Sequence, residues 1–360
     1  MNATFPEFTK KLGFGFMRLP KKGEDIDLEH TARMVDLFLA AGFQYFDTAY
    51  PYYMGKSETV LRDCLVSRYP RESFLLANKL SAPYFETQEE IRPFFQQQLT
   101  RCSVEYFDYY LFHAMSEARH ERFLTINAYD EIQQLKKEGK IRHVGLSFHD
   151  TPEVLERILT DRPELEFVQL QFNYVDYEDP EVESRRCYEV CQKYGKPVFV
   201  MEPVRGGSLV NLPQRALEKL TGGSPASYAI RFAASFPGVA MVLSGMSNEE
   251  QLLDNVSFMK DFIPLTPEEH KILAEVRTLY QAQHNIPCTA CSYCTEGCPM
   301  EIPIPEIFRQ INKSRGEEPK APEQQILMQA SACINCNHCT EICPQHLQIP
   351  QLLKETKNFF

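Results

Sequence analysis

Two cysteine runs in the last quarter of the chain constrain its fold more than any other feature of the sequence. Both runs have the spacing C-x2-C-x2-C-x3-C, and both are followed directly by proline. Three thiols spaced in this way can face one side of a tight loop, whereas the fourth begins a segment that points elsewhere. The runs consist of Cys288, Cys291, Cys294 and Cys298 before Pro299, and of Cys333, Cys336, Cys339 and Cys343 before Pro344.

This spacing is that of the bacterial two-cluster ferredoxins, in which the fourth cysteine of each run ligates the cluster of the other. It predicts two [4Fe–4S] clusters. Zinc takes four ligands, usually in two separated pairs, and does not require a three-plus-one run twice. We assign cluster one to Cys288, Cys291, Cys294 and Cys343, and cluster two to Cys333, Cys336, Cys339 and Cys298.

The distribution of cysteines also predicts the domain organisation. The remaining four of the twelve cysteines are scattered over the first 287 residues, so the composition changes near residues 281–287. We expect a large domain over residues 1–283 and a small α-helical ferredoxin-like domain over residues 284–360. Prolines suited to a first helical turn predict short helices near Pro305 and Pro322.

Composition excludes several classes of partner. The formal net charge is −11 and no Lys/Arg block stands out, so we expect neither nucleic acid nor an anionic membrane as a partner. No apolar run approaches the roughly 18 residues of a membrane span. The first residues lack the apolar core of a secretory signal, and many cysteines without export favour metal over disulfides. We therefore expect a cytoplasmic protein.

Short apolar runs alternate with amphipathic stretches over the first 265 residues. Eight runs have the β-branched and aromatic content of strands. Eight β/α units in this length are typical of a (β/α)8 TIM barrel, whereas an open doubly wound sheet rarely has eight such regular units. The expected strands are Gly13–Met17, Gln44–Asp47, Phe74–Lys79, Phe107–His113, Ile141–Ser147, Phe167–Gln171, Pro197–Met201 and Val239–Leu243.

Helix boundary signals agree with these strands. Gly42, Gly139 and Gly195 each follow a helical pattern and precede a strand, where a left-handed helix cap favours glycine. Thr87–Glu90 and Thr266–Glu269 have the sequence of capping boxes.

Polar residues follow consecutive strands at the end of the barrel where catalysis is found. Asp47, Lys79 and His113 end the second, third and fourth strands, and Tyr52 follows in the loop after Asp47. A buried lysine needs a partner, which Asp47 can be, and an adjacent tyrosine could pass a proton to a carbonyl oxygen. From spacing alone, a structural ion pair and a core histidine explain the pattern equally well.

Three segments resemble the aldo-keto reductases: YFDTAYPYYMGKSE (residues 45–58), LANKL (residues 76–80) and YYLFHA (residues 109–114). That family is a (β/α)8 barrel with a nicotinamide cofactor and an Asp–Tyr–Lys–His catalytic tetrad. The resemblance covers about the first 265 residues and implies these roles for Asp47, Tyr52, Lys79 and His113, with Tyr53 as the alternative tyrosine. A barrel followed by a ferredoxin-like segment resembles an iron–sulfur branch of the superfamily.

The resemblance also implies cofactor-binding positions. Ser147 and Gln169 match residues that hold the nicotinamide carboxamide, and Met201 stands where an aromatic ring often stacks. Because residues 244–255 contain no Lys or Arg, the choice between NADP and NAD stays open, and the missing ring leaves room for FMN. Loops after the last two strands could cradle the phosphates through Arg205, Gly206, Gly207, Ser244, Gly245, Met246, Gln251 and Asn255.

Together these patterns predict an iron–sulfur oxidoreductase of aldo-keto reductase type. It would transfer hydride between NAD(P)H and a small-molecule carbonyl or alcohol, and its clusters would exchange single electrons with a flavoprotein or ferredoxin partner. The alternative is an electron-transfer or redox-sensing protein whose barrel binds nicotinamide or flavin but does not reduce carbonyls.

Overall fold

The structure is a computed structural model that describes residues 5–315 and 321–356. Its internal contacts divide the chain into two compact units. The first consists of Met1–Glu178, Val182–Pro203 and Ile230–Pro264, and the second of Asp179–Glu181, Val204–Ala229 and Leu265–Phe360. The second unit therefore contains residues 204–229 in addition to the cysteine runs, and the boundary at residues 283 and 284 stays a prediction.

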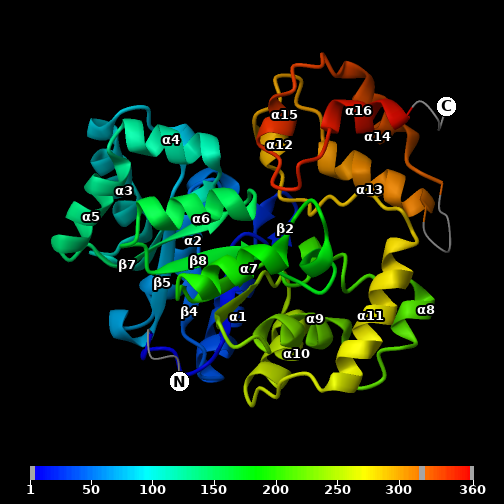
Figure 1. The fold of residues 1–360 in the computed structure, drawn as a ribbon, viewed down its shortest axis with the longest axis horizontal. Helices are drawn as coiled ribbons and strands as arrows, with labels where there is room; N and C mark the ends of the chain where they lie inside the picture. The colour runs from blue at the N-terminus through cyan, green and yellow to red at the C-terminus, as the bar shows by residue number, and fades with distance from the viewer. Residues whose placement is uncertain (1–4, 316–320, 357–360) are drawn as a thin grey trace. The chain divides into compact units, whose positions relative to one another are not determined.

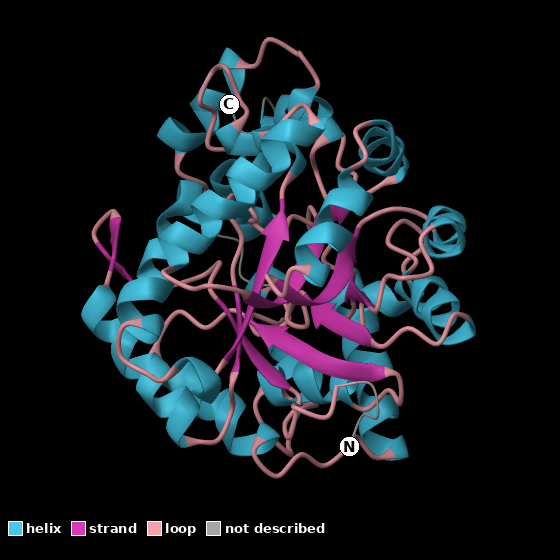
Figure 2. Ribbon diagram, turned by 90° about the vertical axis from the view of Figure 1, so that its left-hand side faces the viewer, coloured by secondary structure: helices cyan, strands magenta, loops and turns pink. Residues whose placement is uncertain are grey.

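A closed barrel of parallel strands forms the core of the first unit, with helices around it (Figure 2). Each strand pairs with its neighbours in chain order, and the last strand closes on the first. The (β/α)8 barrel and all eight predicted strands are thus confirmed. The strands are β1 (Leu12–Gly15), β4 (Tyr45–Asp47), β5 (Leu75–Leu80), β6 (Phe107–Met115), β7 (Ile141–Phe148), β8 (Phe167–Gln171), β9 (Val198–Met201) and β10 (Val239–Ser244).

The helices of the barrel follow its strands, as Figure 1 labels them. They are α1 (Leu28–Ala40), α2 (Lys56–Leu61), α3 (Gln88–Cys102), α4 (Glu117–Thr125), α5 (Ala128–Lys137), α6 (Pro152–Asp161), α7 (Ser184–Lys193) and α10 (Glu249–Met259), while α9 (Pro225–Ala234) has residues in both units. Gly42, Gly139 and Gly195 have positive φ, and Thr87 and Thr266 cap α3 and the later helix α11 (Pro267–Gln281) with complete capping boxes. These local signals are read correctly because each depends on only a few neighbouring residues.

Aromatic side chains fill the end of the barrel opposite the predicted site. Phe5 and Phe8 precede the first strand and pack against Tyr109 and Phe199, with ring centroids between 5.3 and 5.7 Å apart. A two-stranded hairpin, β2 (Lys21–Lys22) with β3 (Asp25–Ile26), was not predicted from the sequence.

The second unit is helical, and its cysteine-bearing part is built from two similar halves. Its helices are α8 (Gln214–Leu217), α11 (Pro267–Gln281), α12 (Tyr293–Glu296), α13 (Ile304–Arg315), α14 (Gln324–Met328), α15 (His338–Glu341) and α16 (Ile349–Lys354). Helices α12 and α13 begin 45 residues before α15 and α16, which is also the offset between the cysteine runs. Left-handed backbone recurs at the same offset, at Ala290, Ser292 and Glu301 in the first half and at Asn335, Asn337 and His346 in the second.

Apolar side chains from both halves form one small core, which includes Ile286, Ile304, Phe308, Leu327 and Ile349. Within the described ranges 5–315 and 321–356, no helix combines the length and the apolar character needed to cross a bilayer.

Candidate active site and cluster sites

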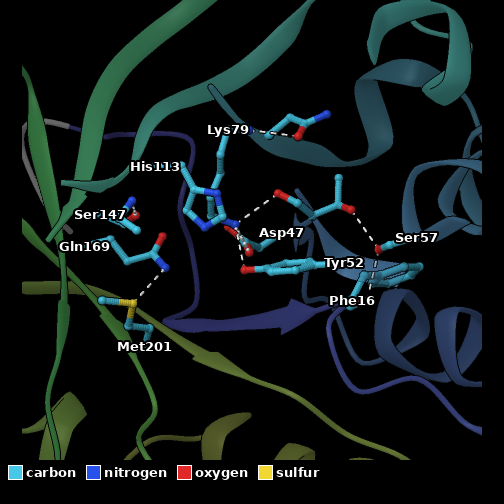
Figure 3. A network of polar contacts seen from close by, with 12 residues as sticks. Phe16, Asp47, Tyr52, Ser57, Lys79, His113, Ser147, Gln169 and Met201 are labelled. Carbon is cyan, nitrogen blue, oxygen red and sulfur yellow. Dashed lines mark hydrogen bonds and ion pairs between the residues drawn. The ribbon is translucent and has the colours of Figure 1, made fainter. Parts of the chain in front are cut away.

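The ammonium of Lys79 is the centre of the predicted catalytic site (Figure 3). Lys79 lies in β5, and its Nζ donates hydrogen bonds to Asp47 Oδ1 at 2.6 Å, to the Thr48 carbonyl oxygen at 3.0 Å and to the Tyr52 hydroxyl at 3.1 Å. An ammonium has three protons to donate, so these three acceptors satisfy it completely. Because an ammonium accepts no hydrogen bond, the Tyr52 phenol oxygen is the acceptor and its own proton points away from Lys79.

Burial controls the charges of this pair. Asp47 and Lys79 are both buried, and burial lowers the pKa of Lys79 and raises that of Asp47, while the opposite charge of each partner counteracts the shift. A lone ion would be very costly at this depth, and the 2.6 Å contact is what keeps the two charges together. Thr48 supports the arrangement, since its hydroxyl bonds to Ser57 at 2.8 Å and Ser57 donates to the Phe16 carbonyl.

The structure distinguishes the two candidate tyrosines. Tyr52 faces Lys79 and lies edge-on to His113, with ring centroids 6.3 Å apart. The hydroxyl of Tyr53 instead accepts a hydrogen bond from the Leu19 amide at 3.2 Å. Tyr52 therefore belongs to the cluster of polar side chains, and Tyr53 lies outside it.

His113 is held by Ser81, a residue that the sequence did not single out. Ser81 Oγ lies 2.6 Å from His113 Nδ1, and both side chains are buried. Burial, followed by the charge of Lys79, holds the pKa of His113 well below its usual value, so the imidazole is neutral. With Nδ1 directed at Ser81, Nε2 is the other hydrogen-bonding nitrogen of the ring. Ser81 could have been found from the alternation of side chains, because it shares its side of the strand with Lys79.

A bulge sets the direction of His113. The pairing of β6 with β7 shifts between Phe112 and Met115, and Ala114 has a φ of 51°. The Ala114 amide donates to Ser147 Oγ at 2.7 Å. Such bulges redirect side chains at barrel rims, which places His113 above Tyr52 and Lys79.

A second polar network lies behind Lys79, on the outer side of β5, and sequence analysis missed it. Asn78 Oδ1 accepts from the Lys79 amide at 2.8 Å and from Gln98 Nε2 at 3.2 Å, and its Nδ2 donates to Glu58 at 2.9 Å. Gln98 also donates to the Lys79 carbonyl at 3.0 Å. All of these side chains are buried, and burial raises the pKa of Glu58 to about 7 although Arg101 lies beside it.

Two of the predicted nicotinamide residues lie together on neighbouring strands. The Nε2 of Gln169 in β8 donates to the sulfur of Met201 in β9 at 3.5 Å, and Gln169 Oε1 is buried without a hydrogen-bond partner in the described part of the chain (Figure 3). A buried orphan amide oxygen normally has a partner in the complete protein, and a carboxamide NH2 group would supply one. Ser147 already accepts the Ala114 amide, and its hydroxyl proton can still be donated.

The predicted phosphate residues fall into both compact units. In the first unit, Ser244 Oγ accepts from Asn255 at 2.8 Å, and Gln251 Oε1 accepts from the Ser247 amide at 2.8 Å. Gly245 and Met246 continue this segment toward α10.

In the second unit, Arg205 is buried and donates to the Tyr280 hydroxyl of α11 at 3.1 Å. Gly206 packs so closely on the backbone of Thr289 that a Cβ there would overlap the Thr289 carbonyl, and Gly207 has a φ of 90°. This loop therefore makes specific contacts within the second unit, and its role toward a cofactor stays a prediction.

Arg18 adds a cation that the sequence pattern did not reveal. It follows β1, and a Cβ at Gly245 would lie 3.2 Å from its side-chain carbons. Its guanidinium pairs with Glu202 at 3.4 Å. Residues 244–255 lack a basic residue of their own, but Arg18 packs against their first glycine.

The eight cysteines of the two runs line two separate cavities of the second unit, and each cavity has the crossed membership expected from the spacing. The lining of one includes Cys288, Cys291, Cys294 and Cys343. The lining of the other includes Cys298, Cys333, Cys336 and Cys339. Of the described residues, no group of three or more Cys, His, Asp or Glu is arranged to hold a single metal ion.

Buried hydroxyls next to both cavities also suit a sulfide-containing group. Thr295 and Thr340 follow the third cysteine of each run, and within the described residues neither hydroxyl has a hydrogen-bond partner. Hydrogen bonds to the sulfurs are one of the means by which proteins tune such clusters.

Comparison with known proteins identifies the family. The model of the Aldo/keto reductase family matches residues 11–278, which is most of the chain. The chain belongs to this family. A model described as a 4Fe-4S dicluster domain matches residues 287–347. The protein is therefore an oxidoreductase of the aldo/keto reductase family that carries a 4Fe-4S dicluster domain.

Similar proteins agree with this assignment. The uncharacterized oxidoreductase YqkF of Bacillus subtilis is 25% identical over 274 residues, which covers 67% of this chain and 85% of YqkF. The holo form of the aldo-keto reductase AKR11C1 from Bacillus halodurans is 25% identical with a TM-score of 0.61, covering 74% and 91% of the two chains. An aldo-keto reductase of Klebsiella pneumoniae in complex with NADPH has the same fold at 20% identity, with a TM-score of 0.61 and coverage of 75% and 90%.

Proposed function

We propose that the barrel transfers hydride between NAD(P)H and a small-molecule carbonyl or alcohol, with Tyr52 as the proton donor and acceptor. The observation that carries the proposal is the Lys79 ammonium, which donates to Asp47, Thr48 and Tyr52 at once. This arrangement stabilises a negative charge on the Tyr52 oxygen and directs its proton away from Lys79. A phenol in this position can give its proton to a carbonyl oxygen as the oxygen becomes an alkoxide.

His113 would orient the carbonyl. Its imidazole is neutral because burial lowers its pKa, and Ser81 occupies Nδ1. We assign the donor role in this contact to the Ser81 hydroxyl, which puts the imidazole proton on Nε2, where it would be donated to the substrate oxygen beside the Tyr52 hydroxyl. When bound, the nicotinamide supplies the hydride for the carbonyl carbon.

The proposed contacts with the cofactor come from side chains of the barrel strands. Gln169 offers its unpartnered Oε1 to the carboxamide, with Ser147 as a second contact. NADP is the preferred candidate, because the Klebsiella protein of the same fold is in complex with NADPH. NAD is the alternative, and Met201 in place of a stacking ring leaves room for FMN.

We further propose that residues 284–360 hold two [4Fe–4S] clusters with the crossed ligand sets lining the two cavities. The clusters would move single electrons to or from a flavoprotein or ferredoxin, while residues 1–283 form the reductase domain.

The test is anaerobic turnover of the purified protein with NADPH or NADH and a series of aldehydes and ketones, followed by nicotinamide absorbance. Carbonyl-dependent oxidation of the nicotinamide, with one alcohol formed per NAD(P)H, is expected. Tight NAD(P)H binding without any carbonyl-dependent oxidation would contradict the proposal and favour a barrel that only binds the cofactor.

A further inference from the structure

The two cavities that hold the cysteines differ in their surroundings, although the segments that form them are repeats of one another. Position for position, the residue after the first cysteine is Thr289 in the first run and Ile334 in the second. The residue two positions after the fourth cysteine is Met300 in the first run and Gln345 in the second. Because the fourth cysteines cross over, Met300 and Ile334 line the cavity of Cys333, and Thr289 and Gln345 line that of Cys288.

Exposure is the reverse of what polarity would predict. Around the Cys288 cavity, the polar Thr289 and Gln345 are only 2% and 8% exposed. Around the Cys333 cavity, the apolar Ile334 and Met300 are 59% and 43% exposed. Buried polar residues and neighbouring exposed apolar residues are the informative departures from the usual distribution, and here they fall at equivalent positions of the two halves.

The two cavities differ in how the chain covers them. Thr289 is buried because the loop at Gly206 packs directly on its backbone. Nothing in the described part of the chain does the same for Ile334, which remains largely exposed together with Cys336. The second cluster therefore has an open side with an apolar centre, as expected of a small protein interface.

Charge limits the kind of partner. The two cysteine runs and their immediate neighbours, residues 287–302 and 332–347, include three glutamates and no lysine or arginine, and the six lysine and arginine residues of 284–360 all lie outside these two segments. Thiolate-bound clusters add further negative charge. A partner that docks here must therefore carry basic residues around an apolar centre, since matched potentials guide such encounters.

We propose that Ile334 and Met300 form the docking surface through which cluster two exchanges electrons with a small carrier protein whose redox cofactor reaches its surface within a ring of basic residues. The inference rests on the proposed cluster assignment and is independent of carbonyl reduction. In each exchange, one electron leaves a reduced [4Fe–4S] cluster, which is oxidised, and enters the carrier's cofactor, which is reduced, and no proton moves. Redox encounters of this kind use small interfaces, so two apolar residues can form the centre of one.

Cytochrome c is a suitable probe, because it is basic and its haem edge lies within a ring of lysines. The holoprotein is reduced with dithionite, freed of excess reductant and mixed with ferric cytochrome c by stopped flow under argon. Each rate is divided by the rate with ferricyanide, a small acceptor that needs no docking surface. Complex formation with cytochrome c at low salt is measured separately by sedimentation velocity.

The variants exchange residues between equivalent positions of the two cysteine runs. Ile334→Thr combined with Met300→Gln places the residues of the first cavity at the second without changing charge. Ile263→Thr, at a residue 68% exposed in the barrel unit, is the matched control. We expect the double variant to lower the cytochrome c to ferricyanide rate ratio by about tenfold, the size of a modest interface hot spot, and to weaken the complex.

Three results would overturn the proposal. The first is an unchanged rate ratio in the double variant, and the second is an equal loss in Ile263→Thr. The third is a protein that sediments as a dimer and becomes a monomer in the double variant, which would mean that a second copy of the chain covers this surface. If dithionite does not bleach the wild-type protein, the cluster assignment is refuted instead. Failure of the cluster assignment can therefore be distinguished from failure of the docking proposal.

Discussion

The hydroxyl of Ser81 lies 2.6 Å from Nδ1 of His113, and this contact determines which imidazole nitrogen faces the barrel mouth. A neutral imidazole has one donor and one acceptor nitrogen and a serine hydroxyl can pair with either, so we take Ser81 as the donor to Nδ1 and Nε2 as the nitrogen that carries the proton. Asp47 and Thr48 accept two of the three protons of the Lys79 ammonium, and the third is directed at the Tyr52 hydroxyl. Around the site, contacts of this kind orient the groups that we propose to touch substrate.

Ser81→Ala should therefore lower kcat for carbonyl reduction without affecting the fold. Loss of one neutral hydrogen bond is worth about 1 kcal/mol, which corresponds to roughly fivefold in rate. Ser81→Thr keeps the hydroxyl and should restore most of the activity. If Ser81→Ala is as active as the wild type at every pH, the hydroxyl does not orient His113.

Tyr52→Phe should lower kcat by roughly 10²–10⁴, the usual contribution of a positioned proton donor. The change removes one oxygen, so iron content and circular dichroism should be unchanged. Tyr53→Phe is the matched control, because the Tyr53 hydroxyl binds the Leu19 amide and not Lys79. Loss of activity in Tyr53→Phe with an active Tyr52→Phe would exchange the roles of the two residues.

Much of this site could be predicted from the sequence, because the strands, the helix caps and the order of Asp47, Lys79 and His113 are local patterns. The barrel then brings consecutive strand ends together, whatever the residues between them. Ser81 follows the same alternation as Lys79 and was overlooked. The contacts of Arg205 with Tyr280 join residues 75 positions apart, and no local pattern reports such a pair.

The Glu58 network was missed for a different reason. Asparagine and glutamine are common in loops and on surfaces, so neither Asn78 nor Gln98 stands out in the sequence. Their hydrogen bond joins residues 20 positions apart and forms only when α3 packs on β5. The difference between the two cysteine runs, in contrast, is visible in the sequence, because Thr289 follows the first cysteine of one run and Ile334 follows that of the other. Its meaning emerges only when the exposure of the two residues is known.

Glu58 should make stability depend on pH near neutrality. Its pKa rises from 4.5 to about 7 on folding because it is buried, so ionisation costs the folded state more than the unfolded state. The stability present below pH 4.5 is thus lost as the pH rises through 7, by at most about 3 kcal/mol. Arg101, Cys102 and Tyr110 face the same carboxylate and share in this balance.

Urea unfolding of Glu58→Gln between pH 5 and 8 measures this contribution. The wild type should lose stability across this interval relative to the variant, and Glu72→Gln, at an exposed carboxylate, should behave as the wild type. Parallel pH profiles for wild type and Glu58→Gln would show that Glu58 does not titrate in this range.

Crossed ligation predicts which cysteine variants share a phenotype. Anaerobically prepared protein should contain about eight iron and eight sulfide per chain, as two four-iron clusters require. Cys294→Ser and Cys343→Ser should damage the same cluster although the residues belong to different runs, and Cys298→Ser should group with Cys336→Ser. Electron paramagnetic resonance of the reduced variants distinguishes the two clusters. Grouping by run, with Cys294→Ser resembling Cys298→Ser, would mean that the ligation is not crossed.

The last prediction concerns the passage of electrons between nicotinamide and clusters. A hydride carries two electrons, whereas each [4Fe–4S] cluster changes by one, and flavins are the usual cofactors that accept a hydride and release its electrons singly. We therefore expect NADPH or NADH alone to bleach the clusters of flavin-free protein much more slowly than turnover, and added FMN or a flavoprotein to accelerate the bleaching. Stopped-flow absorbance under argon measures both rates, and Tyr52→Phe should leave them unchanged if no carbonyl is involved. Bleaching within the time of one turnover, with no flavin present, would show that the barrel reduces the clusters directly.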